Sequence, residues 1–485
     1  MNANLSRISA VMILAVLACQ APAFGFDSSY PFFTDPLGTA PAVLEKGVIL
    51  PGDTAPISCY VPKDFSRPLA LGEAVDIALC NNPQIKSAWA NIKIQAGAVG
   101  EARAAYLPTL TGVLSRVNDR ITYSDNSLPT SSVDETTFQG GFTWRIFDFG
   151  GRAANHRAAN NLLTAALANH NAALQKALSD VIQAYFDAMT ANAALKATIE
   201  GEEIAKSTLS SAKVREEKGV VSQSDRLRAT TALAKAVLEN NRAHGDYQKA
   251  LAVLGQIMGV PGKTVISMPE DITADTGEIS SDLNHWLEEA QQNHPAIIAA
   301  KEQVKAAENQ VTVARSAGLP TLNFYGNYYN NTGPGQAVTP NAEERTVGIG
   351  LNIPIFDGFS NTYKIRGAQA QVEQKQAALA DTENRIALEL IKAYVDATFS
   401  LQNLDASVNL LEAAREALTV SQRRYDKGAA DITEILNTQS TLSEAQRERI
   451  RCLAEWHSAR LRLLASAGQM GRPAVTEQNH APLEK

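Results

Sequence analysis

The sequence predicts a mainly helical protein with a smaller β component, built from one unit that occurs twice. Asn82-Pro83 corresponds to His294-Pro295 at an offset of 212 residues, and Lys218-Gly219 corresponds to Lys427-Gly428 at an offset of 209. Such a period far exceeds the repeats of solenoid proteins, so it indicates a duplicated domain. Each half is expected to contain a helix, a β-hairpin, a very long helix and a further helix.

The amino terminus has the features of a secretory signal. Residues 8–18 form an apolar run of 11 residues, which is too short to cross a bilayer as a helix. Small residues up to Ala23 provide a cleavage site, so residues 1–23 are expected to form a signal peptide. The alternative is lipidation of Cys19. Residues 24–68 then form an extended periplasmic arm.

The two repeats are expected at residues 69–260 and 282–470, with a linker at 261–281 and a tail at 471–485. The first helix of each repeat starts near Leu71 or near Leu283. It is expected to continue until a proline, Pro108 or Pro320, forces the preceding residue out of the α conformation.

Four segments then change from a helical period to a period of two. In the second segment apolar Phe142 is followed by polar Thr143, and in the fourth Leu351 is followed by Asn352. The first segment is noisier, with Val113 on its apolar side. Such alternation is what a barrel with a lipid-facing outside and a wet lumen requires. The expected strands cover about residues 109–123, 136–147, 320–330 and 345–355.

The segments between the paired strands, residues 124–135 and 330–344, are polar and rich in turn-forming residues. They are typical of exposed hairpin loops.

Two proline-free helical runs follow, residues 152–218 and 361–427. At 1.5 Å per residue each would be roughly 100 Å long, too long for a compact globular core. Leucines of the second run recur every seven residues, which indicates a coiled coil. Gly219 and Gly428 are expected to end these helices, and new helices run back from Ser222 and Asp431.

Four strands in one chain cannot close a barrel, and an open sheet edge in lipid leaves backbone groups unpaired. The chain is therefore expected to oligomerise. Two copies would give eight strands and an interior filled by side chains, whereas three copies give 12 strands and leave a lumen.

These features, taken in order and duplicated, resemble the TolC-type outer-membrane efflux family over about residues 69–470. The resemblance rests on the Leu-Pro pair before each strand pair, the KG turns, and Phe147-Asp148-Phe149-Gly150-Gly151 with its twin Phe356-Asp357-Gly358-Phe359. It implies a homotrimer whose 12-stranded barrel lies in outer-membrane lipid and continues as an α-helical periplasmic barrel. It further implies an exit duct that works with a periplasmic adaptor and an inner-membrane transporter.

The arm around Cys59 and the segment 78–83 resemble the CyaE-type branch, which secretes adenylate cyclase-haemolysin toxins. This branch implies type I protein secretion with an ABC-type transporter. Multidrug efflux is the alternative within the class, and a structural coiled-coil protein of the periplasm is the alternative outside it.

The resemblance also places gating and ion-selecting residues around the KG turns. Carried over to this chain, they are Tyr425, Ser224, Asp225 and Glu434. The hairpin tips, where the adaptor would make contact, are Lys218, Gly219, Lys427 and Gly428.

This chain departs from the family pattern at two positions near the second turn. Ala430 stands where the family's best-known member has an arginine link, and Asn437 replaces a second acidic ring position. For Glu434 two interpretations remain open. It forms a ring of carboxylates that favours cations, or it pairs with a neighbouring helix.

Cysteine use fits an oxidising compartment. A Cys59–Cys80 disulfide would join the arm to the first helix, and two unpaired buried thiols are the alternative.

Charge and composition argue against several other functions. The net charge of −7 argues against nucleic-acid binding. The histidines are scattered, with no HExxH motif or Cys/His cluster, so no metal site is expected. Gly262-Lys263-Thr264 lacks the first glycine of a phosphate-binding loop, because Ile257 stands there. No catalytic residue, cofactor or enzyme activity is expected, so a partner must supply the energy for transport.

Overall fold

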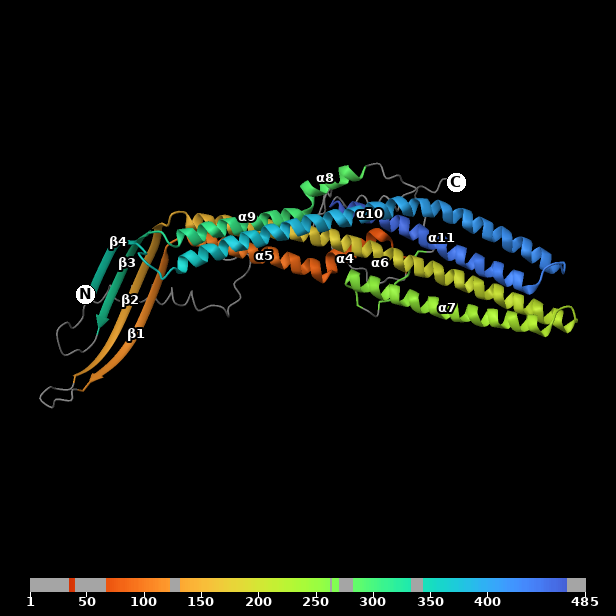
Figure 1. Cartoon of the computed structure of the whole chain (residues 1–485). Coiled ribbons are helices and arrows are strands. Elements are labelled where there is room, and N and C mark those ends of the chain that lie inside the picture. Colours follow the sequence, from red (N-terminus) through yellow and green to blue (C-terminus); the bar gives the residue numbers. More distant parts are fainter. Residues whose placement is uncertain are drawn as a thin grey trace.

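The computed structural model describes residues 35–39, 67–122, 131–261, 264–269, 282–332 and 343–468. The molecule is a long rod with a four-stranded sheet at one end and the tips of two helical hairpins at the other (Figure 1). Both repeats run the whole length of the rod, and the two halves meet where β2 (Ser131–Phe147) pairs with β3 (Thr321–Thr332) and where α6 (Gly151–Glu217) packs against α9 (Pro295–Ser316). None of the described helices combines the length and apolar character needed to cross a membrane.

Each repeat opens with two helices and not with the single helix that was predicted. Pro83 and Pro295 occupy the first turn of the second helix in each half. The residues before them have ψ angles of 123° and 124°, outside the helical range, as expected before a proline. The helical segment before each strand pair is therefore interrupted at Pro83 or Pro295, well before the predicted ends at Pro108 and Pro320. The helices are α4 (Leu71–Asn81), α5 (Pro83–Ala104), α8 (Leu283–Asn293) and α9 (Pro295–Ser316).

The four strands form one antiparallel sheet in the order β1-β2-β3-β4. Three strands extend further into the hairpin segments than predicted, since β2 begins at Ser131, β3 ends at Thr332 and β4 begins at Glu343, whereas β1 ends at Ile121 and not near residue 123. β4 ends before Pro354, which has no N–H to donate to a ladder. Their bounds are β1 (Thr109–Ile121), β2 (Ser131–Phe147), β3 (Thr321–Thr332) and β4 (Glu343–Asn352).

The register gives the sheet one continuous apolar face. Directly opposed residues of antiparallel strands share a face, and the register opposes Leu110 to Phe142 and Phe324 to Ile349. The rings of Phe142 and Phe324 meet edge to face, with 5.7 Å between centroids, which joins the two halves of this face. The prediction of which side chains lie on the apolar face is therefore confirmed for the last three strands.

The predicted phase of the first strand was wrong. Val113 lies opposite Gln139, on the polar side of the sheet, whereas Leu114 lies opposite Phe138 on the apolar side. The strand contains valines at odd positions and leucines at even positions, so its own pattern is ambiguous. Only pairing with β2 decides which set faces the same way as Phe142.

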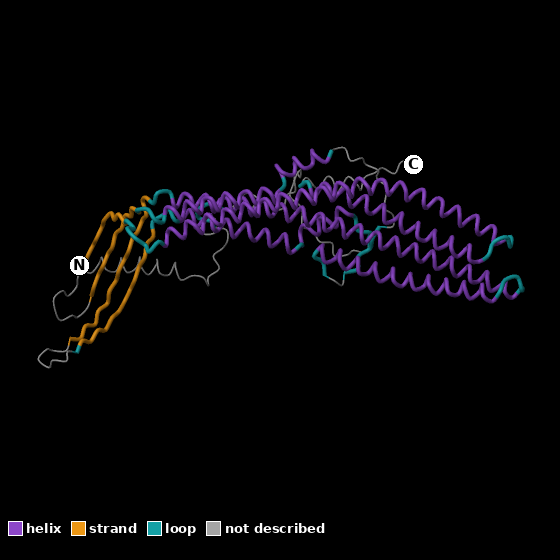
Figure 2. The backbone as a smooth tube through the Cα atoms, viewed as in Figure 1, coloured by secondary structure: helices purple, strands orange, loops and turns teal. Residues whose placement is uncertain are grey.

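The two longest helices are α6 (Gly151–Glu217) and α10 (Ser360–Asp426), each of 67 residues and therefore about 100 Å long. They pack against the returning helices α7 (Gln223–Met258) and α11 (Ile432–Ser466), as the tube in Figure 2 shows. The heptad leucines predicted on α10 lie in this contact. Leu404 is buried against Trp456, and Leu411 and Leu418 pack around Leu442.

The largest core lies in the middle of the rod, where α4 packs on α6 and α7. Tyr185 donates its buried hydroxyl to the carbonyl of Leu69 at 2.9 Å, and burial raises the pKa of this phenol. This contact fixes the start of the first repeat to the long helix α6.

Candidate functional site at the hairpin tips

The far tips of the two helical hairpins have the same local structure. Gly219 and Gly428 adopt positive φ angles of 71° and 75°, the left-handed conformation in which glycine avoids Cβ strain. The residues after them donate backbone N–H groups to the carbonyls of Arg215 and Arg424 at 2.8 Å. The turns therefore close by capping of the helix C-terminus, as the KG motifs predict.

The returning helices begin where the sequence predicts. The Ser222 hydroxyl accepts the N–H of Asp225, while the Asp225 carboxylate accepts the N–H of Ser222 at 3.1 Å, so the two form a capping box. Asp431 accepts the N–H of Thr433 at the start of α11, and these hydrogen bonds lower the pKa of its carboxyl group.

An apolar cluster joins the two tips. Tyr425 is only 3% exposed, and it packs with Ile432 and Ile435 from α11 against Leu209 and Ala229 of the first hairpin. Ala430, at the position of the missing arginine link, packs against the same cluster. The structure therefore brings Tyr425 into contact with both hairpins.

Arg215 is the polar link between the hairpins, and sequence reasoning missed it. Its guanidinium lies 4.2 Å from the centre of the Tyr425 ring and donates to the Tyr425 carbonyl at 2.9 Å. It also approaches the Asp426 carboxylate at 3.5 Å. Burial raises the pKa of the Tyr425 phenol, and the charge of Arg215 opposes that effect.

Glu434 is paired with Arg424 at 2.8 Å, across the second tip. Within one chain this geometry matches the interpretation of Glu434 as a partner of a neighbouring helix. A ring of carboxylates concerns several chains, so that interpretation stays a prediction.

The repeat offset of 209 could have identified these arginines. It relates Arg215 to Arg424 and Asp225 to Glu434. In the second half the arginine pairs with the acid of its own hairpin. In the first half the acid caps its helix and the arginine reaches across to Tyr425. Ser224, the remaining predicted gate residue, is exposed beside the cap.

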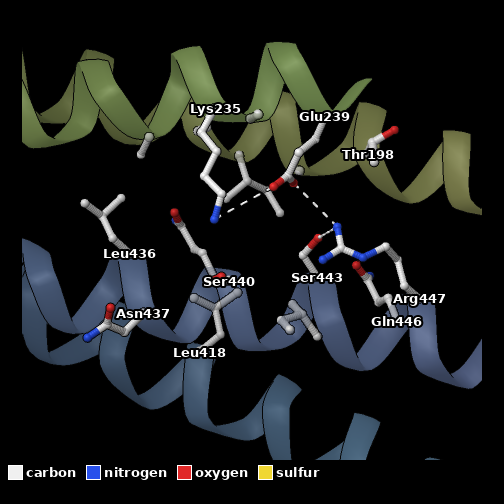
Figure 3. Close-up of a pocket in the computed structure, with 17 residues that line it drawn as sticks. Thr198, Lys235, Glu239, Leu418, Leu436, Asn437, Ser440, Ser443, Gln446 and Arg447 are labelled. Atoms are coloured by element: carbon white, nitrogen blue, oxygen red, sulfur yellow. Dashed lines mark hydrogen bonds and ion pairs between the residues drawn. The ribbon is translucent and has the colours of Figure 1, made fainter. Parts of the chain in front are cut away.

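A cavity of about 270 Å³ lies between the two hairpins, on the side of the tips that faces the sheet (Figure 3). Glu239 of α7 points into it, 3.8 Å from Lys235 and 3.5 Å from Arg447 of α11. Asn437, the residue at the second acidic ring position, also lines this space. The two hairpins are therefore less tightly packed here than at the Tyr425 cluster.

The cysteines are only partly described. Cys80 is disulfide-bonded, whereas Cys452 is a buried free thiol. Cys59 lies outside the described residues, so the Cys59–Cys80 pairing stays a prediction. Within the described ranges, no group of three or more His, Cys, Asp or Glu side chains is arranged to hold a metal ion.

Comparison with known proteins places this architecture. The family model described as "Outer membrane efflux protein" matches residues 74–260 and 286–469, one match in each repeat. The chain belongs to the outer membrane efflux protein family. This membership confirms the predicted family and its outer-membrane location, and the family consists of channels, not enzymes.

Individual relatives cover most of the chain. Protein CyaE of Bordetella pertussis is 35% identical over 443 residues, which are 91% of this chain and 92% of that protein. The outer membrane efflux protein BepC of Brucella suis is 23% identical over 436 residues, 89% of this chain and 90% of its own length.

Solved structures of this family share the fold. The CusC channel has a TM-score of 0.74 at 17% identity and covers 87% of this chain and 100% of its own. VceC from Vibrio cholerae has a TM-score of 0.72 at 19% identity and covers 82% of this chain and 96% of its own. The predicted fold class, mainly α with β in a duplicated unit, is confirmed.

Proposed function

We propose that this chain forms the exit duct of a tripartite export system, most specifically one for type I protein secretion. The observation that carries the proposal is a sheet with one continuous apolar face and one polar face, joined directly to helices of about 100 Å. An apolar outside and a polar inside suit a pore wall in lipid. The helices extend that wall away from the membrane.

The open edges of the sheet support the proposed homotrimer. Within the described residues β1 and β4 each pair on one side only, and both edges would be costly in hydrocarbon. Three copies joined edge to edge give the 12-stranded barrel expected from the sequence. Apolar side chains along β1 and β4, such as Leu110 and Val347, are 80% and 73% exposed in one chain and would face lipid.

The transported class is proposed from similarity. The long match to protein CyaE supports a place in the type I branch. A shorter match, 21% identical over 46% of this chain, is to the proteases secretion protein PrtF of Dickeya chrysanthemi. The energy would come from an ABC-type inner-membrane transporter, reached through a periplasmic adaptor that contacts Lys218, Gly219, Lys427 and Gly428.

The tips would form the gate of this duct. Opening would require the two hairpins of one chain to separate. The contact between Arg215 of the first hairpin and Tyr425 of the second holds them together. Glu434 and Arg424 stabilise the second tip on its own. In this proposal Tyr425 latches the gate, while Glu434, Asp225 and Ser224 set the charge and polarity at its rim.

The proposed Cys59–Cys80 bond would tie the arm to α4. Cys59 and Cys80 should resist alkylation in denatured, unreduced protein and react after reduction. Labelling of both thiols before reduction would exclude the bond.

Two measurements test the duct. Mass measurement of the complex extracted from outer membranes should give three chains, and planar bilayers containing it should carry an ionic current. A stable monomer, or a trimer without current, would contradict the proposed function.

A further inference from the structure

A hollow in the part of the helical rod nearest the sheet is lined mainly by the side-chain amides of Asn and Gln. It has a volume of about 500 Å³ and lies near the strand end of the helices, between α5, α6, α9 and α10. Seven of its thirteen lining residues are Asn or Gln, whereas Lys375 is the only one with a charge. The Lys375 ammonium donates to the Gln303 side chain at 3.1 Å, so that charge already has a partner.

The hollow lies on the concave side of the wall. In this part of the rod α6 and α9 pack together in the middle, with α5 packed outside α6 and α10 outside α9. Buried Ala166 and Ala306 of the middle helices form the floor, and amides of the outer helices form the sides. Residues of both outer helices, α5 and α10, line the same hollow as residues of the middle helices, so the four-helix layer curves toward this side. When three such layers close into a tube, the concave side faces the lumen.

The other side of the same helices has a different character. A second hollow between α9 and α10 is lined by Glu308, Arg315 and Glu373, together with Gln369. Its residues lie about half a turn away from the first set on both helices, given 3.6 residues per turn. Amides therefore predominate in the first hollow, where Lys375 is the one charged lining residue, whereas three of the seven residues that line the second hollow are charged.

We infer that the amide-lined hollow is a contact site for an extended, unfolded polypeptide passing through the duct. This inference rests on the proposed function and names the class of substrate. Every residue of an extended chain except proline presents one backbone donor and one acceptor. Side-chain amides carry both kinds of group, so they pair with any backbone regardless of its sequence.

The chemistry of the hollow fits other cargo less well. A drug-sized molecule is held mainly by apolar and aromatic side chains, and none of the lining residues is aromatic. Ion selection uses rings of charged side chains or backbone carbonyls. An uncharged wall also avoids retaining acidic or basic segments of a long chain.

The test measures how long a peptide blocks the current of the trimeric, full-length channel in planar bilayers. The probe is an unstructured glycine–serine peptide without charged side chains, added from the strand side. The variant Gln371→Met/Gln374→Met keeps side-chain length but removes the amides. Gln369→Met, on the opposite face of α10, is the matched control.

The double variant removes two amides from each of three chains and should shorten each block roughly tenfold, which corresponds to the loss of about one net hydrogen bond to the bound peptide. The peptide should block the Gln369→Met channel for as long as it blocks the unaltered channel. Without peptide, all three channels should carry the same current. Equal block times in the double variant and the unaltered channel, or the same loss in Gln369→Met, would overturn the inference alone. Absence of current in the unaltered channel would overturn the proposed function itself.

Discussion

Replacing His294 by asparagine is expected to make the fold less sensitive to acid. His294 is buried at the start of α9, where its Nδ1 accepts the backbone N–H of Ala296 at 3.2 Å. Burial, aided by the nearby Arg385 charge, lowers the pKa of this imidazole from 6.5 to about 4. Protonation would remove the acceptor and place a positive charge at a helix N-terminus, where it is unfavourable.

The sign and size of the effect follow from this pKa. In the unfolded chain the imidazole takes up a proton below pH 6.5, but in the folded chain only near pH 4. Its contribution to stability is therefore complete above pH 6.5 and is lost as the pH falls toward 4. The full difference corresponds to about 3 kcal/mol per chain, of which about 2 kcal/mol is lost between pH 7 and pH 5.

The first repeat supplies the matched control. Asn82 occupies the equivalent cap, and its side-chain oxygen accepts the N–H of Gln84 at 2.8 Å without any group that titrates in this range. His294→Asn should therefore keep the cap at pH 7 and gain about 2 kcal/mol over the unaltered protein at pH 5. The reciprocal Asn82→His should add a second acid-sensitive cap and lose stability at pH 5.

The assay is denaturant unfolding of the detergent-solubilised protein, followed by circular dichroism at pH 7 and pH 5. Other histidines, such as His170, whose pKa burial also lowers, contribute equally to all three proteins and cancel in the comparison. If His294→Asn loses as much stability between the two pH values as the unaltered protein, the capping argument is refuted.

Three substitutions test the sheet and the tips. Phe142→Arg, on the apolar face, should cost about 2–4 kcal/mol near mid-membrane and lower trimer yield, whereas Thr143→Arg should be mild; equal yields would contradict the assigned faces. Glu434→Ala should reduce cation selectivity in planar bilayers if the carboxylates form a ring. If Glu434 only forms the ion pair with Arg424, Glu434→Ala should instead lower the stability of the tip and leave cation selectivity unchanged. Tyr425→Phe keeps the ring and the backbone carbonyl that Arg215 contacts, so it tests the hydroxyl alone; it should raise open conductance if the hydroxyl helps to latch the tip, and an unchanged conductance would exclude that role of the hydroxyl.

The sequence by itself determined the features that depend on neighbouring residues. The KG turns, the Ser222 and Asp431 caps and the alternation in the last three strands follow from local backbone preferences and periodicity. The repeat offset predicted the duplicated architecture. The helix break at Asn82-Pro83 is also encoded locally, because a proline disfavours the helical conformation in the residue before it.

The tertiary structure decided what depends on residues far apart in the chain. The face of β1 was ambiguous until its register with β2 opposed Leu110 to Phe142. The link between Arg215 and Tyr425 joins residues 210 positions apart, and no local pattern indicates that this arginine leaves its own hairpin. Its equivalent, Arg424, pairs locally with Glu434, although the two halves have the same turn. Which partner each arginine takes depends on how the two hairpins pack in space, because a guanidinium binds whatever acceptor or ring the packing brings within its reach.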